Sequence, residues 1–274
     1  MKRLFFSLIL VLLLSAVHAG TVDTIMVHSF KMNKDIPVTV TYPKLTKENR
    51  DRVYPVVYLL HGAYANEYKW LQLKPNLRQI ADNRGMIFVT PYVQNSWYFD
   101  SPINKDFQYE TFCIDELIPY IDANYPTIPD RKHRAVTGLS MGGHGAFFLG
   151  VRHKDVFGAI GSMSGGVDIR SFPKNWNIPD VLGDYDTNKK TWDEHTVMEV
   201  VSNLKNHELE IIFDCGEGDF FIDVNKALHA KLLKLGVDHD FTTRPGGHTD
   251  QYWANSLDYQ LLFFKKYFRG EMKQ

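Results

Sequence analysis

Ser140 is the residue of this chain whose surroundings point most clearly to chemistry. It lies in Gly138-Leu139-Ser140-Met141-Gly142, which fits the G-x-S-x-G pattern. In that pattern a serine sits on a tight turn between a strand and a helix, with its hydroxyl exposed. Residues 133–137 are partly β-branched and predict the strand, and residues 141–150 begin with small residues. Small residues are needed there because the two backbones approach closely, so Ser140 is a predicted nucleophile.

His248 is the predicted base for this serine. A serine hydroxyl is a poor nucleophile at neutral pH and needs a base within hydrogen-bond reach, which a carboxylate orients in turn. His248 follows Pro245-Gly246-Gly247, between a strand expected at 238–243 and a helix expected at 250–268. Of the 11 histidines, only His248 combines a loop after a strand with a position after both the serine and an acidic segment.

The orienting carboxylate is expected in the acidic segment 214–223. Asp214 is expected to end a strand, and Asp223 to begin a helix, where an acid favours the helix N-terminus. Glu217 and Asp219 remain in the loop between them. We favour Asp219 as the acid and keep Glu217 as the alternative.

Backbone N–H groups are expected to stabilise the negative charge that develops during attack on a carbonyl. One should come from Met141, directly after the nucleophile. The other should follow the segment Leu59-Leu60-His61-Gly62, where the glycine permits a sharp turn. Ala63 is the preferred second donor and Tyr64 the alternative. We interpret His61 as structural, because the other residues already supply a base.

The elements that must position these residues alternate along the chain. Two β-rich segments, 21–30 and 36–42, predict an antiparallel hairpin. Further strands are expected at 54–60, 86–92, 133–137, 157–164, 208–215 and 238–243, and helices at 76–83, 107–125 with a break at Pro119, 141–150, 222–235 and 250–268. This alternation predicts an α/β fold with a mostly parallel sheet and helices on both faces. In such sheets ligands bind at the carboxyl ends of the strands.

The N-terminal residues predict export. A basic start, Met1-Lys2-Arg3, precedes an apolar run from Leu4 to Val17, and Ala19 offers a cleavage site. This pattern is typical of a signal peptide over 1–19, and the run is short for a membrane anchor, which is the alternative. The remaining residues, 20–274, suit a single domain, periplasmic or secreted and without a membrane segment.

The composition of the chain limits which partners and cofactors are expected. The formal net charge is −1, so nothing in it favours a nucleic acid or an anionic membrane as a partner. Cys113 and Cys215 lie in contexts typical of buried thiols, and we expect them to be free. Asp184–Asn188 imitates the start of a calcium loop, but Lys189 and His195 stand where that loop needs glycine and glutamate, so no metal is expected.

Six stretches of the sequence resemble one family. It is the esterase-D-like or "putative esterase" branch of the α/β-hydrolases, which includes feruloyl, acetyl-xylan and tributyrin esterases, S-formylglutathione hydrolases and mycolyltransferases. The resemblance implies the α/β-hydrolase fold, a Ser140, Asp219 and His248 triad, oxyanion donors at Ala63 and Met141, and no cofactor. Thr249 is a mild departure, because an aspartate commonly follows the histidine. The matching stretches are Leu59–Gly62, Asn95–Tyr98, Asp115–Tyr120, Gly138–Gly143, Cys215–Phe220, and Gly247-His248 with Tyr252-Trp253.

We expect an exported serine esterase that acts through an acyl-enzyme. Its substrates would be acetyl or feruloyl groups on carbohydrates, or small short-chain esters. Trp97, Tyr98 and Trp253 are candidates for lining the substrate pocket, with core packing as the alternative for the two tryptophans. Residues 168–206 are expected to form a partial rim around an open cleft. Two other functions stay open: transfer of an acyl group to a sugar, and glycan binding without catalysis.

Overall fold

A single eight-stranded sheet runs through the protein. The computed structural model describes residues 20–272, so the expected signal peptide, residues 1–19, lies outside the described part. The strand order is β1-β2-β4-β3-β5-β6-β7-β8. β2 pairs antiparallel with β1 and β4, and every other pair is parallel. The mostly parallel sheet with an antiparallel N-terminal hairpin is thereby confirmed. The strands are β1 Thr21–Ser29, β2 Lys34–Tyr42, β3 Val56–Leu60, β4 Ile87–Pro91, β5 Arg134–Gly138, β6 Ala159–Met163, β7 Glu210–Gly216 and β8 Asp240–Arg244.

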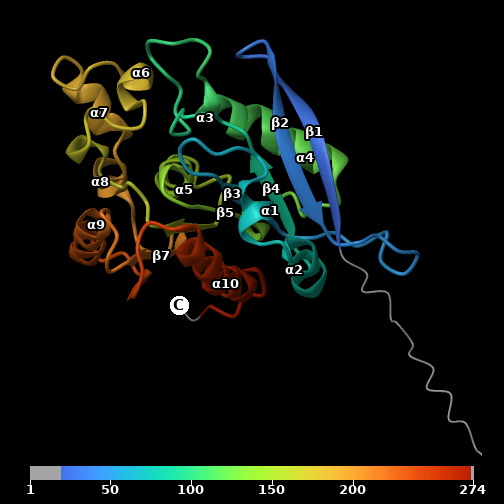
Figure 1. Ribbon diagram of the computed structural model, residues 1–274. Coiled ribbons are helices and arrows are strands. Elements are labelled where there is room, and N and C mark those ends of the chain that lie inside the picture. The colour runs from blue at the N-terminus through green and yellow to red at the C-terminus, as the bar shows by residue number, and fades with distance from the viewer. Residues whose placement is uncertain (1–19, 273–274) are drawn as a thin grey trace, which may run out of the picture.

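Helices cover both faces of the sheet, as the alternation of elements predicted (Figure 1). The hairpin β1–β2 forms one end of the molecule, and the helices α6 to α9 gather at the other. The α-helices are α1 Lys69–Leu73, α2 Leu77–Arg84, α3 Tyr109–Thr111, α4 Ile118–Asn124, α5 Met141–Arg152, α6 Ile178–Leu182, α7 Lys189–His195, α8 Val197–Val200, α9 Ile222–Lys234 and α10 Asp250–Phe268. Shorter helical segments are η1 Phe112–Leu117, η2 Arg131–His133, η3 Ile169–Ser171 and η4 Val201–Asn203.

The core is divided by the sheet into two apolar layers. All five residues of β3 are buried, which explains why this strand is a continuous apolar run in the sequence. Because successive side chains of a strand point to opposite faces, Tyr58 and Leu60 pack with α4, α5 and α9, whereas Val57 and Leu59 pack with α1, α2 and α10. Each layer contains residues from distant parts of the chain, so it forms only when those parts pack against the sheet.

The helical segment around Pro119 differs from the sequence expectation. Helical structure continues from Tyr109 to Asn124, and Pro119 lies in the first turn of α4 instead of breaking the helix. The preceding segment, Phe112–Leu117, is a π-helix. A proline has no N–H to donate, and its ring crowds the carbonyl four residues earlier. The wider π turn just before Pro119 relieves both problems, and the helix carries on.

The sheet brings the candidate chemical groups to one edge. β3, β5, β7 and β8 are parallel or linked through parallel neighbours, so their carboxyl ends lie at the same edge. The loops that leave these ends carry Ala63, Ser140, Asp219 and His248, respectively. Within residues 20–272, none of the helices combines the length and apolar character that crossing a bilayer requires.

Candidate active site

Ser140 occupies a sharp turn between β5 and α5. Its backbone angles are φ 55° and ψ −117°, a combination that non-glycine residues rarely adopt. Such a conformation persists only where the surroundings enforce it, and it often accompanies function. Close packing at Gly142 is one such constraint. A Cβ atom at this position would lie 2.4 Å from the carbonyl oxygen of Leu60 and 2.7 Å from that of His61. The small residues noted in the sequence therefore let α5 start directly against β3.

Three side chains that are far apart in sequence form one hydrogen-bonded series. His248 Nε2 lies 2.9 Å from Ser140 Oγ. On the other side of the ring, His248 Nδ1 lies 3.1 Å and 2.9 Å from the two carboxylate oxygens of Asp219. An ionised carboxylate only accepts hydrogen bonds, so the proton of the neutral imidazole belongs on Nδ1. Nε2 is then free to accept the hydroxyl proton of Ser140, which is the arrangement needed to activate a serine.

Asp219 is fixed more firmly than a surface acid would be. Its side chain is fully buried, and Oδ1 also accepts the backbone N–H of Phe221 at 2.8 Å. Glu217, the alternative acid, is exposed and lies 3.4 Å from the hydroxyl of Thr243. Asp214 lies in β7 and Asp223 in the first turn of α9, as expected. Of the four carboxylates, Asp219 is the one in contact with His248.

Two backbone N–H groups near Ser140 are available to a negatively charged oxygen. Among the described residues, neither Ala63 nor Met141 donates its N–H to a protein acceptor. The N–H of Tyr64, the alternative donor, is taken by Asn95 Oδ1 at 2.7 Å. Met141 is the first residue of α5, where unpaired N–H groups and the helix dipole favour an anion. This arrangement leaves Ala63 and Met141 as the candidate pair.

His61 holds the loop that carries Ala63. Its Nε2 accepts the N–H of Val93 at 3.1 Å, and its Nδ1–H donates to the carbonyl oxygen of Gly62 at 2.8 Å. The Tyr98 hydroxyl donates to the His61 carbonyl at 3.0 Å. Burial lowers the pKa of His61 to about 4, so the imidazole is neutral near pH 7 and can make both bonds. These contacts give His61 the structural role expected from the sequence.

A cavity of about 220 Å³ opens over Ser140. The Trp253 ring meets the His248 ring edge-on with centroids 4.8 Å apart, and the Phe220 ring lies 4.3 Å from the same imidazole. Trp176, from the rim segment, stacks on Phe220 at 5.9 Å. Phe220 is 54% exposed and Tyr64 is 73% exposed, so the rim opens to solvent. The lining residues are Gly62, Ala63, Tyr64, Ala65, Lys69, Leu139, Ser140, Trp176, Phe220, His248 and Trp253.

Two of the three predicted pocket residues do not reach the cavity over Ser140. Trp97 and Tyr98 are buried, and neither lines the cavity over Ser140. Trp97 Nε1 donates to the carbonyl oxygen of Trp176 at 3.1 Å, which ties the rim segment to the body of the protein. Tyr98 supports His61, as described above. Trp253 alone lies in the cavity wall, and the other two side chains serve packing in this conformation.

Lys69, Trp176 and Phe220 line the cavity but were not among the predicted site residues. Lys69 Nζ pairs with the Asp250 carboxylate at 2.8 Å. Phe220 could have been predicted from the sequence, because it directly follows Asp219 in the loop that reaches the site. Trp176 belongs to the segment 168–206, which was expected to form a rim, but nothing in the sequence singled out this residue for contact with the cavity. Lys69 has no sequence signal, because its placement depends on how α1 packs. Within residues 20–272, no three His, Cys, Asp or Glu side chains gather as metal ligands would.

Comparison with known proteins assigns the family. The model of the family described as "Putative esterase" matches residues 29–264. An acetyl esterase of Caldicellulosiruptor saccharolyticus is 25% identical over 240 residues, 82% of this chain and 90% of that protein. An endo-1,4-beta-xylanase/feruloyl esterase of Xylanibacter ruminicola is 41% identical over 134 residues, which are 46% of this chain and 18% of that protein.

A solved structure supports the same assignment. A ferulic acid esterase superposes with a TM-score of 0.78 at 32% identity, covering 91% of this chain and 99% of that one. The family match spans most of the chain, and the arrangement of the sheet and helices agrees with that of the solved α/β-hydrolase. The chain therefore belongs to the "Putative esterase" family and is a carboxylic ester hydrolase with the α/β-hydrolase fold.

Proposed function

We propose that this protein is an exported serine esterase that removes acetyl or feruloyl-type acyl groups from carbohydrates or from small esters. The observation that carries the proposal is the hydrogen-bonded series Ser140–His248–Asp219, with distances of 2.9 Å on both sides of the imidazole. The acyl groups are suggested by the names of its relatives, an acetyl esterase and a ferulic acid esterase.

The proposed reaction starts with attack of Ser140 Oγ on the ester carbonyl carbon. His248 Nε2 takes the hydroxyl proton as the new C–O bond forms, and Asp219 stabilises the resulting imidazolium. The carbonyl oxygen becomes an oxyanion, which the N–H groups of Ala63 and Met141 stabilise. His248 then returns its proton to the leaving alkoxide, so the C–O bond of the ester breaks and an alcohol departs. Ser140 is left acylated.

Water completes the proposed cycle. A water molecule gives a proton to His248 and attacks the acyl carbon, and a second oxyanion forms against the same two N–H groups. Its collapse breaks the bond to Ser140, which regains its proton from His248, and the free acid leaves. The exposed rim at Tyr64 and Phe220 supports entry of both a bulky ester and water.

Replacing Ser140 with alanine tests the proposal. The Ser140→Ala protein should lose hydrolysis of p-nitrophenyl acetate and methyl ferulate by about 10³-fold or more, since no nucleophile remains. Circular dichroism and the melting temperature of the variant show whether it folds like the wild type. Equal rates for the folded variant and the wild type would refute the role of Ser140.

Export is proposed from the N-terminal sequence alone. The basic start and the apolar run from Leu4 to Val17 support it. N-terminal sequencing of the protein from an exporting bacterial host should find the chain beginning at Gly20, and fractionation should place it outside the cytoplasm. Full-length protein retained in the cytoplasm would refute export.

A further inference from the structure

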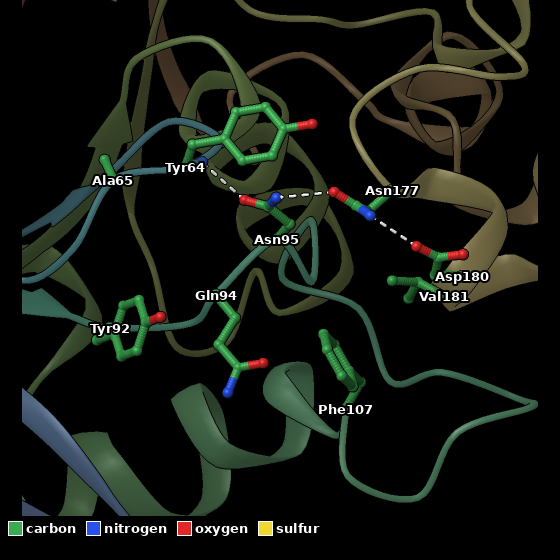
Figure 2. Close-up of a pocket in the computed structure, with 9 residues that line it drawn as sticks. All are labelled: Tyr64, Ala65, Tyr92, Gln94, Asn95, Phe107, Asn177, Asp180 and Val181. Atoms are coloured by element: carbon green, nitrogen blue, oxygen red, sulfur yellow. Dashed lines mark hydrogen bonds between the residues drawn. The ribbon is translucent and has the colours of Figure 1, made fainter.

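A second cavity lies beside the first and has a different chemical character. It measures about 430 Å³, which is within the usual range for small-molecule sites. Tyr64 and Ala65, in the loop after β3, line both cavities and therefore form the boundary between them. Figure 2 shows its lining, in which the amide and carboxylate groups of Asn95, Asn177 and Asp180 form one row and Tyr92, Gln94 and Phe107 lie below them in the view.

One side of this second cavity is a chain of hydrogen-bonded polar side chains. Asn95 accepts the N–H of Tyr64 and donates through Nδ2 to Asn177 Oδ1 at 3.0 Å. Asn177 Nδ2 in turn donates to Asp180 Oδ2 at 2.6 Å. Figure 2 shows the three bonds in line. They connect the loop that carries the candidate oxyanion donor Ala63 to the rim helix α6, so the amide and carboxylate groups are held in fixed orientations.

Other polar groups in the cavity are not engaged. Among the described residues, the Gln94 amide and the Tyr92 hydroxyl make no hydrogen bond with the protein. Gln94 and Tyr64 both have positive φ, 54° and 60°, although neither is glycine. Non-glycine residues in this conformation cluster at ligand-binding segments. The strained backbone presents an unpaired amide and a largely exposed aromatic ring at the two sides of the cavity.

We propose that this second cavity binds a sugar unit of the alcohol part of the ester, an inference that rests on the proposed function. A sugar carries several hydroxyl groups that both donate and accept, and it has flat apolar faces. Fixed amides and a carboxylate match the hydroxyl groups, and the rings of Tyr64, Tyr92 and Phe107 match the faces. A phenolic acyl group offers fewer polar atoms and would leave the Gln94 amide or the Tyr92 hydroxyl without a partner.

The test compares one acyl group on two alcohols. Rates are measured with p-nitrophenyl acetate and an acetylated xylo-oligosaccharide, and with methyl ferulate and a feruloylated oligosaccharide. Gln94→Ala should lower kcat/KM for the sugar esters, relative to the simple esters, by about three- to tenfold, mainly through KM. Tyr92→Phe should lower the same ratio about threefold. Gln79→Ala, an exposed glutamine on α2, is the matched control and should leave the ratio unchanged.

The results distinguish a sugar site from a structural defect and from an acyl-group site. An equal loss on simple and sugar esters would mean a structural defect and overturn the inference. A selective loss on methyl ferulate relative to p-nitrophenyl acetate would place the acyl group in the cavity and also overturn it. If the wild type hydrolyses no ester, the proposed function fails. In that case, NMR titration of the Ser140→Ala protein with a deacylated xylo-oligosaccharide still tests the sugar site. Binding that Gln94→Ala weakens would support the site. Absence of binding would overturn it.

Discussion

Asp219 and Glu217 stand two residues apart in one loop, yet their surroundings differ completely. The Asp219 side chain is fully buried, contacts His248 with both oxygens and accepts a backbone N–H. Glu217 is exposed and lies beside a threonine hydroxyl. A buried carboxylate that accepts from His248 can hold the ring with its proton on Nδ1. An exposed acid that does not contact His248 cannot do so. At the scale of single residues, burial and distance therefore choose between the two acids.

A matched pair of substitutions checks this choice. Asp219→Asn keeps the shape of the side chain but can donate to Nδ1 and so stabilise the wrong tautomer of His248. It should lower kcat for p-nitrophenyl acetate by about 10³- to 10⁴-fold. Glu217→Gln should change kcat by less than about twofold, because an isolated surface acid interacts weakly with the site. The opposite ranking of the two variants would transfer the role to Glu217.

Among the elements, the contact between α5 and β3 positions the nucleophile. α5 begins at Met141, immediately after the strained Ser140, and Gly142 lies directly against the end of β3. The approach is possible only without a side chain at position 142. The same glycine therefore sets both the packing of α5 and the direction of the Ser140 hydroxyl.

Substitution of Gly142 should damage stability and activity together. In Gly142→Ala the new methyl group clashes with backbone oxygens that cannot move freely, so unfolding free energy should fall by about 1–3 kcal/mol. The displaced serine should lower kcat about tenfold or more. Urea denaturation and hydrolysis assays measure the two effects. Gly236→Ala, in open space at φ 68°, is the control: it should cost about 1 kcal/mol and leave kcat intact. Full activity of Gly142→Ala would contradict this account of the turn.

Across the whole molecule, a buried histidine makes stability depend on pH. His144 on α5 is fully buried, and neither ring nitrogen has a hydrogen-bond partner among the described residues. The rings of Trp97, Phe99 and Phe148 pack against it, and the charges of His195 on α7 and of Asp168 act on it more weakly than burial does. Burial lowers the pKa of His144 to about 3.

The direction of the pH effect follows from that lowered pKa. The unfolded chain, with its histidine pKa near the ordinary 6.5, takes up a proton before the folded protein does as pH falls. His144 therefore destabilises the fold increasingly below about pH 6.5. As pH falls from 7 to 5, the free energy of unfolding of the His144→Phe variant should rise by about 2 kcal/mol relative to that of the wild type. Urea denaturation at both values measures this, and a difference independent of pH would refute it.

The candidate triad was predictable from sequence because its members follow local rules. Ser140 stands in a turn pattern that demands small neighbours, Asp219 follows a largely apolar strand, and His248 follows a more polar strand near the end of the chain. Parallel strands place such loops at a common edge, so the order of residues along the chain predicted that Ser140, His248 and an acid, Asp219 or Glu217, would meet. The Pro119 segment was not predictable in this way, because helix continuation depended on a π turn stabilised by packing.

Only the tertiary structure decided which aromatic and amide side chains line the site. Trp97 and Tyr98 follow a strand just as Ser140 does, yet they turn into the core, where Trp97 contacts Trp176 and Tyr98 supports His61. Asn95, beside them, instead holds the N–H of Tyr64 and so leaves Ala63 as the candidate donor. The positions of the strands along the chain and the turn that carries Ser140 follow from local sequence patterns. The contacts of a side chain depend on partners far away in the sequence, such as Trp176, which lies 79 residues after Trp97, and local sequence patterns do not predict such pairs.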